Sequence, residues 1–169
     1  IILMGYANPL FAYGMADFAK TASEYGVDGL IIVDLPPEED CILREHTQQY
    51  GLDIIRLITP TTDEERLPKV LDGAGGFLYY VSITGVTGAA KPDPEALKPH
   101  IQAIKSKSKL PVVIGFGIKT PEDAKNMAGL ADGIVVGSSI VEKIALLQGD
   151  KKDISDVSDF VKSLSTALK

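Results

Sequence analysis

Two glycine-containing segments follow apolar, β-branched runs late in the chain. Residues 115–118 are Gly-Phe-Gly-Ile, and residues 135–139 are Val-Val-Gly-Ser-Ser. A glycine at a strand end lets an anion approach the bare backbone, and the N-terminus of a following helix supplies N–H donors and the positive end of its dipole. One such segment is equally explained by a tight turn, but two consecutive ones predict a phosphate-binding site.

A third glycine-containing loop, Thr-Gly-Val-Thr-Gly at residues 84–88, follows an expected strand at 76–82. The next helix is expected to begin only at Pro94, so this connection is unusually long. Long loops at a catalytic face are commonly lids, with a passive surface loop as the alternative. In the preceding strand, Tyr79 and Tyr80 must point to opposite faces, one toward the interior of the fold and one toward the helices.

Other residues able to do chemistry are few. Asp34 is the one acid at the end of an expected strand, whereas proton transfer to an uncharged ligand usually needs two groups with opposed protonation. The lone Cys41 cannot form an internal disulfide, and His46 and His100 are too few for a His-rich metal site. The residues alone therefore predict a phosphate-binding face, no metal and no particular reaction. A reducing cytoplasm is the expected location.

The elements that must position these residues are visible as a repeated pattern. Nearly continuous apolar runs rich in β-branched residues are typical of parallel strands covered on both faces. Such runs occur at 1–6, 28–34, 53–58, 76–82, 111–116 and 132–137. Segments with helical spacing lie between them, and one of these has a single apolar stripe formed by Met15, Phe18, Ala19 and Ala22.

Capping residues and glycines mark the expected helix boundaries. Starts are indicated by Thr-Asp-Glu-Glu at 62–65, Asp-Pro at 93–94 and Thr-Pro at 120–121, and stops by Gly26, Gly51 and Gly73. Six parallel βα units indicate either a doubly wound sheet or part of a (β/α)₈ TIM barrel. The turn after the first strand contains no glycine, which argues against a dinucleotide-binding fingerprint and favours the barrel.

Length and composition are those of one globular domain over residues 1–169, with 45% hydrophobic and 24% charged residues. The 17 basic and 23 acidic residues give a net charge of −6, which argues against nucleic-acid binding. The apolar runs are too short to cross a membrane, and the opening residues lack the basic segment of a signal peptide. Because the chain opens inside an apolar strand, we expect it to be the C-terminal part of a longer protein.

Six motifs occur in the order and at the spacing found in the tryptophan synthase α subunit family, and this resemblance extends from the first residue to about Val141. The motifs are Met-Gly-Tyr-Ala-Asn-Pro at 4–9, Val-Asp-Leu-Pro-Pro-Glu-Glu at 33–39, Thr-Pro-Thr-Thr at 59–62, Gly-Val-Thr-Gly at 85–88, Gly-Phe-Gly-Ile at 115–118 and Gly-Ser-Ser-Ile-Val at 137–141. The resemblance implies a (β/α)₈ TIM barrel with six of its eight βα units in this chain. It also implies a lyase of tryptophan biosynthesis, which cleaves indole-3-glycerol phosphate to indole and glyceraldehyde 3-phosphate by a retro-aldol reaction.

The resemblance further implies roles for individual residues. Tyr79 and Thr87 match a site tyrosine and a lid threonine that support catalysis. The family's two proton-transfer carboxylates, a Glu and an Asp, lie upstream of Ile1, so these 169 residues alone are expected to be inactive. The phosphate site matches Gly88, Gly117, Gly137 and Ser138, and the indole pocket matches Met4, Tyr6, Ile31, Ile58, Phe116 and Val135.

A partner is implied as well. Positions matching a surface that meets the tryptophan synthase β subunit, in an α₂β₂ complex, are Asn8, Pro9, Asp34 and Pro36. The family reaction uses no metal or organic cofactor, because the pyridoxal phosphate belongs to the β subunit. Two alternatives stay open: another phosphate-binding barrel enzyme of tryptophan or histidine biosynthesis, and a non-catalytic module that only binds phosphate or the β subunit.

Overall fold

The protein is represented by a computed structural model, which describes residues 1–82, 93–115, 117–147 and 154–169. The chain divides into two compact units. The first unit contains Ile1–Tyr79 and Lys107–Leu110, and the second contains Tyr80–Ser106 and Pro111–Lys169. The expectation of one barrel domain over residues 1–169 stays a prediction.

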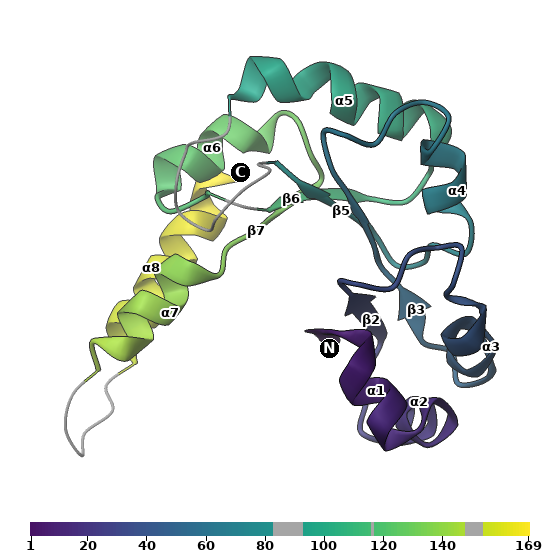
Figure 1. Cartoon of the computed structure of the whole chain (residues 1–169). Coiled ribbons are helices and arrows are strands. Elements are labelled where there is room, and N and C mark those ends of the chain that lie inside the picture. Colours follow the sequence, from purple (N-terminus) through teal and green to yellow (C-terminus); the bar gives the residue numbers. More distant parts are fainter. Residues whose placement is uncertain (83–92, 116, 148–153) are drawn as a thin grey trace. The chain divides into compact units, whose positions relative to one another are not determined.

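The first unit is an alternation of strands and helices, coloured purple to blue-green in Figure 1. Its elements are β1 (Ile2–Gly5), α1 (Ala7–Tyr13), α2 (Met15–Glu24), β2 (Gly29–Ile32), α3 (Cys41–Gln49), β3 (Asp53–Ile54), β4 (Arg56–Ile58) and α4 (Leu67–Leu71). Strands β1, β2 and β3 form a parallel sheet in that order. The strand expected at 53–58 is interrupted at Ile55, so it appears as β3 and β4.

The core of the first unit lies between this sheet and its helices. Leu30 of β2 is fully buried with Leu10 of α1, Ala19 and Ala22 of α2, and Leu43 of α3. Met15 and Phe18 pack against the same cluster, which confirms the predicted apolar stripe. Because side chains alternate along a strand, Leu30 and its register partner Leu3 face the helices, whereas Met4 and its partner Ile31 lie on the opposite face of the sheet.

Most of the expected helix boundaries are confirmed. Gly26, Gly51 and Gly73 have φ of +78°, +67° and +66°, as left-handed helix stops require. The helix start predicted at 62–65 is wrong, because α4 begins only at Leu67. Thr62 Oγ1 instead accepts from the Thr59 N–H at 3.2 Å, and Asp63 accepts from the Arg66 N–H at 2.8 Å. These side chains stabilise a turn before the helix.

The second unit, coloured teal to yellow in Figure 1, again alternates strands and helices. It contains β6 (Val112–Gly115), α6 (Pro121–Ala128), β7 (Gly133–Val135), α7 (Ser138–Ala145) and α8 (Ser155–Ala167), together with most of α5 (Pro94–Lys107). Strand β5 (Leu78–Val81) enters it at Tyr80. Strands β5, β6 and β7 are neighbours in that order, and β6 and β7 are parallel.

Local sequence accounts for the starts of α5 and α6 in the second unit. Thr120 and Asp123 form a reciprocal capping box at the start of α6, with Pro121 at the first helical position. Asp93 accepts from the Glu95 N–H at 3.1 Å beside Pro94, the first residue of α5. Both starts confirm the sequence prediction. Helices α7 and α8 lie side by side (Figure 1).

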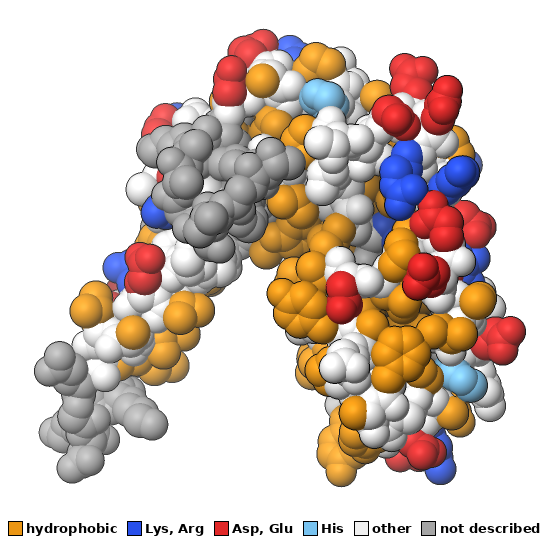
Figure 2. Space-filling view, in the orientation of Figure 1, with side chains coloured by type: hydrophobic (Ala, Val, Ile, Leu, Met, Phe, Trp, Pro, Cys, Tyr) orange, Lys and Arg blue, Asp and Glu red, His pale blue; other side chains and the backbone are white. Residues whose placement is uncertain are grey.

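Both units expose large apolar side chains. In the first unit most of these lie on or beside β1 and α1, where Figure 2 shows orange side chains gathered, and they include Ile2, Met4, Tyr6, Phe11 and Tyr13. In the second unit they lie on α7, α8 and the residues beside them, and they include Val141, Ile144, Leu146, Ile154 and Val161. Within the described residues, no helix is long and apolar enough to span a membrane.

Candidate functional site

The start of α7 has the features of an anion-binding helix N-terminus. Gly137 is the N-cap residue, it is exposed, and no side chain among the described residues caps this helix end. The Gly137 carbonyl accepts from the N–H groups of Ile140 and Val141, at 3.0 and 3.1 Å. The N–H groups of the first helical residues, Ser138 and Ser139, therefore belong to the orphan donors that such a terminus offers to an anion.

Among the described residues, nothing occupies the space beside Gly137. A Cβ built on Gly137 would meet no described heavy atom within 4 Å. Packing against the described residues thus does not require a glycine at this position. A site that needs close approach of a ligand to the backbone accounts for it.

The second predicted glycine segment adjoins the first. The Ser139 hydroxyl, which is buried, donates to the Ile118 carbonyl at 3.3 Å and so ties the start of α7 to the residue after Gly117. Gly117 has φ of +80°, a left-handed conformation that favours glycine. Val135 is half-buried at the end of β7, opposite Gly115 in the register. The structure therefore brings together Gly117, Val135, Gly137 and Ser138, as the spacing of the two strand ends predicts.

Three predicted site residues lie outside the described residues: Thr87, Gly88 and Phe116. Their roles stay predictions.

The first unit carries an apolar group on the sheet face opposite its helices. Met4 of β1 and Ile31 of β2 are register partners there, and alternation places Tyr6 on the same face, directly after β1. Met4 is 61% exposed and Tyr6 60% exposed, whereas Ile31 is buried. A thioether and a phenol ring beside aliphatic carbon form a surface suited to a flat aromatic ligand.

Ile58 occupies the other face. Arg56 and Ile58 alternate with Leu57 along β4, and the Arg56 guanidinium reaches Asp40 at the N-cap of α3, so Arg56 and Ile58 face the helix side. Ile58 is 1% exposed there. Leu57, which is half-buried, lies on the face opposite the helices and is the better placed residue for an indole pocket.

The two tyrosines of β5 separate as expected. Tyr80 is 1% exposed, and its ring centroid lies 6.4 Å from that of His100 on α5, so Tyr80 faces a helix. Tyr79 therefore points to the opposite face of the strand, and it is half-buried. Burial raises the pKa of the Tyr79 hydroxyl, so this group stays protonated near neutral pH and can donate a hydrogen bond.

The four residues predicted to meet a partner lie on two segments of the first unit. Asn8 and Pro9 are exposed in the first turn of α1, and Asp34 and Pro36 lie in the loop after β2. The helix start and the loop are joined, because Asp34 Oδ1 accepts a hydrogen bond of 2.7 Å from the Ala7 N–H. The sequence alone contains no signal for this hydrogen bond between residues 27 positions apart.

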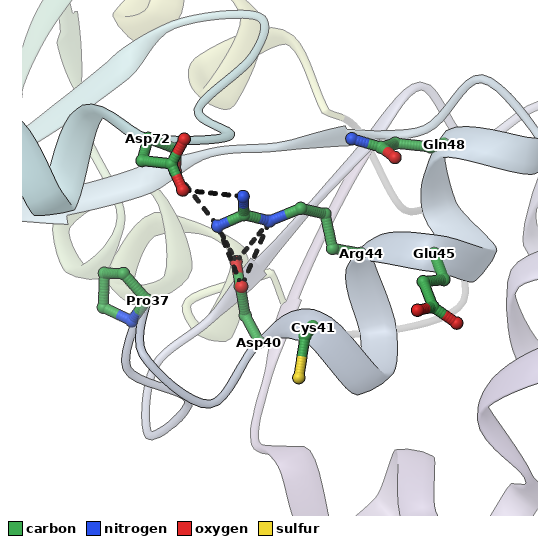
Figure 3. Close-up of a pocket in the computed structure, with 7 residues that line it drawn as sticks. All are labelled: Pro37, Asp40, Cys41, Arg44, Glu45, Gln48 and Asp72. Carbon is green, nitrogen blue, oxygen red and sulfur yellow. Dashed lines mark hydrogen bonds and ion pairs between the residues drawn. The ribbon is translucent and has the colours of Figure 1, made fainter.

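A charged network that sequence reasoning missed lies beside α3 in the first unit (Figure 3). The Asp40 carboxylate is buried and accepts from Arg44 Nε at 3.1 Å. It also accepts from the guanidinium of the buried Arg56, which Figure 3 does not draw. Arg44 also donates to Asp72 at 2.8 Å. Hydrogen bonds to Asp72 and Asp40 raise the pKa of the Arg44 guanidinium. The hydrogen bond between Arg44 and Asp72 also lowers the pKa of the Asp72 carboxyl group.

This network forms part of the wall of an open cavity of about 380 Å³ (Figure 3). Cys41, Glu45 and Gln48 of α3 and Pro37 complete the lining. Arg44 is already bonded to two carboxylates, so it offers no free positive charge to an anionic ligand. Among the described residues, no group of His, Cys, Asp or Glu side chains is arranged to hold a metal ion. The network therefore stabilises the structure around α3.

Known structures closely match this geometry. A crystal structure of tryptophan synthase subunit alpha from Legionella pneumophila is 41% identical, with a TM-score of 0.86, over 99% of this chain and 62% of that chain. The Campylobacter jejuni subunit alpha is 32% identical, with a TM-score of 0.84, over 96% of this chain and 64% of that chain. A structure of the tryptophan synthase α₂β₂ complex from Pyrococcus furiosus is 31% identical, with a TM-score of 0.84, over 98% of this chain and 66% of that chain.

The chain thus spans less than two thirds of the length of these relatives. Its parallel strands and intervening helices are those of a partial (β/α)₈ TIM barrel, as the sequence predicts. The sequence model of the tryptophan synthase alpha chain family matches residues 1–169. This chain belongs to the tryptophan synthase alpha chain family.

Proposed function

We propose that the protein acts as a tryptophan synthase α subunit, which cleaves indole-3-glycerol phosphate to indole and glyceraldehyde 3-phosphate. The observation that carries this proposal is the junction of the two glycine segments at the start of α7, where Ser139 is bonded to Ile118. Membership of the family supplies the reaction, and the junction supplies an anchor for the phosphate of its substrate.

The phosphate anchor uses main-chain groups. The N–H groups at the start of α7 and the positive end of the helix dipole attract the phosphate oxygens, and the Ser138 hydroxyl adds a further donor. Gly137 has no Cβ, and no described atom lies within 4 Å of the point where a Cβ would stand, so the phosphate can approach the backbone there in this proposal. Gly88 completes the anchor in this proposal, as its match to the family motif implies.

The indole ring occupies an apolar surface in this proposal. Met4, Tyr6 and Ile31 supply that surface from the first unit, and the position of Leu57 adds it to the predicted set. Tyr79 acts as a hydrogen-bond donor rather than a base, because its buried hydroxyl has a raised pKa.

Proton transfer is the step that these 169 residues do not supply in this proposal. The reaction requires a base for the glycerol hydroxyl and an acid for the indole carbon, and the family's Glu and Asp match no position of this chain. Asp34, the acid at the end of β2, is bonded to the Ala7 N–H. The 169 residues alone are therefore inactive, since loss of such a group typically lowers a rate about 10²- to 10⁴-fold.

The proposed partner is the tryptophan synthase β subunit, because the Pyrococcus furiosus relative is described in an α₂β₂ complex. Asn8, Pro9 and Pro36 belong to the surface that meets it. Pyridoxal phosphate belongs to that subunit, and this chain uses no metal or organic cofactor of its own. The cytoplasm is the proposed location, where the thiol of Cys41 stays reduced.

The phosphate anchor is tested by calorimetric titration of glycerol 3-phosphate into the protein and its Gly137→Val variant. A branched side chain fills the space for the ligand, so we expect at least tenfold weaker binding in the variant. Gly129→Val is the matched control, because a Cβ there also meets nothing within 4 Å and the residue lies at the end of α6, away from the start of α7. Equal affinity in the two variants would overturn the proposed anchor.

A further inference from the structure

We propose that Asp34 is a positioning residue for partner binding, which holds the start of α1 so that Asn8 and Pro9 face the β subunit. This inference rests on the proposed function for the identity of the partner. The family resemblance implies that Asp34 contacts the partner directly. In this proposal Asp34 instead supports Asn8 and Pro9, which lie in the first turn of α1.

The geometry of the contact indicates this role. Ala7 is the first residue of α1, and Tyr6 before it provides no side-chain cap. The first turn of α1 also contains no acidic residue. The Ala7 N–H is therefore an orphan donor of the helix, and Asp34 Oδ1 satisfies it at 2.7 Å from the adjacent loop. The negative charge also lies at the end of α1 where the helix dipole favours it.

The loop after β2 provides the fixed side of this contact. Its far end is anchored by Asp40, which is buried and paired with Arg56 of β4. Glu38, in the same loop, accepts from Arg66 at 2.8 Å, and this hydrogen bond lowers the pKa of Glu38. Near its start, the Val33 N–H donates to the Gly5 carbonyl at 2.9 Å. Asp34 thus projects from a loop held at several points.

The segment that Asp34 holds is the short helix α1, which carries Asn8 and Pro9. Ala7 and Leu10 are buried and face the core, whereas Asn8 and Pro9 between them are exposed. The orientation of these two exposed residues therefore depends on where the first turn of α1 is held. Without the Asp34 acceptor, the binding-competent orientation becomes one of several, and the apparent affinity falls by the fraction that remains competent.

Two substitutions separate positioning from direct contact. Asp34→Asn keeps an oxygen acceptor for the Ala7 N–H but removes the charge, and Asp34→Ala removes both. A positioning role predicts that Asp34→Asn binds the β subunit within about twofold of the parent protein, while Asp34→Ala binds about tenfold more weakly. Equal weakening in both variants would show that the charge itself meets the partner, which would overturn the inference. Unchanged affinity in Asp34→Ala would overturn it as well.

The titrations use the protein as its organism produces it, with the β subunit of that organism carrying pyridoxal phosphate. Glu39→Ala is the matched control, because Glu39 is an exposed acid of the same loop. Its backbone N–H donates to the Pro36 carbonyl, and its side chain makes no hydrogen bond or ion pair among the described residues. This substitution removes the same charge, and we expect unchanged affinity.

Hydrogen exchange of the Ala7 amide in the protein without its partner distinguishes this inference from the proposed function. We expect faster exchange of this amide in Asp34→Ala and parent-like exchange in Asp34→Asn. If the parent protein does not bind the β subunit at all, the proposed partner is wrong and so is the positioning role. If it binds and the Ala7 amide exchanges equally in all variants, only the positioning role is wrong.

Discussion

Replacing Asp40 by alanine is expected to destabilise the first unit strongly. Asp40 and Arg56 are 1% and 5% exposed, and their ion pair is shielded from water. Removing the carboxylate leaves Arg56 with one described hydrogen bond, to the Asp72 carbonyl at 3.3 Å, while its Nε has no partner among the described residues. A buried charge left without its partner typically costs about 3–5 kcal/mol, and we expect a loss of that size.

Urea unfolding followed by circular dichroism measures this loss. With a slope of about 2 kcal/mol per molar urea, the midpoint should fall by about 2 M. Asp72→Ala is the control within the same network, because its carboxylate is exposed and its backbone carbonyl, which accepts from Arg56, stays in place. We expect a much smaller shift for that variant.

A third variant tests the cause of the loss. Asp40→Leu combined with Arg56→Met removes both charges and fills the space with apolar groups, so most of the lost stability should return. If Asp40→Ala is as mild as Asp72→Ala, the buried pair does not stabilise the fold as argued. If the double variant is no more stable than Asp40→Ala, the loss arises from packing rather than from an unpaired charge.

Two further predictions concern Asp132 and the exposed apolar side chains of β1. Hydrogen bonds from the Val112 N–H and from Lys105 lower the pKa of Asp132 below its ordinary 3.8, so its stabilising contribution is complete above pH 3.8 and is lost as the pH falls through the lowered pKa. Asp132→Asn should therefore reduce the urea midpoint at pH 7 but much less near pH 3. An equal reduction at both pH values would contradict this assignment. The apolar side chains exposed on β1, such as Ile2 and Met4, should make the 169-residue chain associate at rising concentration, and a constant monomer mass by light scattering would refute that expectation.

The fold could be predicted from the sequence because its signals are local. The apolar runs and the glycine stops at 26, 51 and 73 each report the conformation of the segment that contains them. The pair Thr120 and Asp123 does the same for the start of α6. The prediction of a helix start at Thr62 failed because the same side-chain types also cap isolated turns, as Asp63 does here for Arg66.

The face of the sheet on which a residue lies was harder to predict from the sequence. Ile58 was expected in the indole pocket because its position matches that of a pocket residue in the family, whereas the structure places it on the same face of its strand as Arg56. A polar residue in the apolar run was the available signal. Arg56 must find a carboxylate to be buried, so its face, and with it that of Ile58, is the face toward the helices.

Contacts between distant residues were not predictable at all. Asp34 is bonded to Ala7, and Asp40 is bonded to Arg56, but nothing in the local sequence around either acid indicates its partner. The phosphate anchor is an intermediate case. Its two glycine segments were predicted from the ends of two expected strands, whereas the Ser139 hydrogen bond that joins them required the structure.

Release of indole from indole-3-glycerol phosphate is the decisive test of the proposed lyase function. The measurement uses the protein as its organism produces it, with the β subunit present, and follows indole and glyceraldehyde 3-phosphate together. We expect equal amounts of the two products, competitive inhibition by glycerol 3-phosphate, and loss of that inhibition in Gly137→Val. The absence of indole, or indole formation that glycerol 3-phosphate does not inhibit, would refute the proposed function.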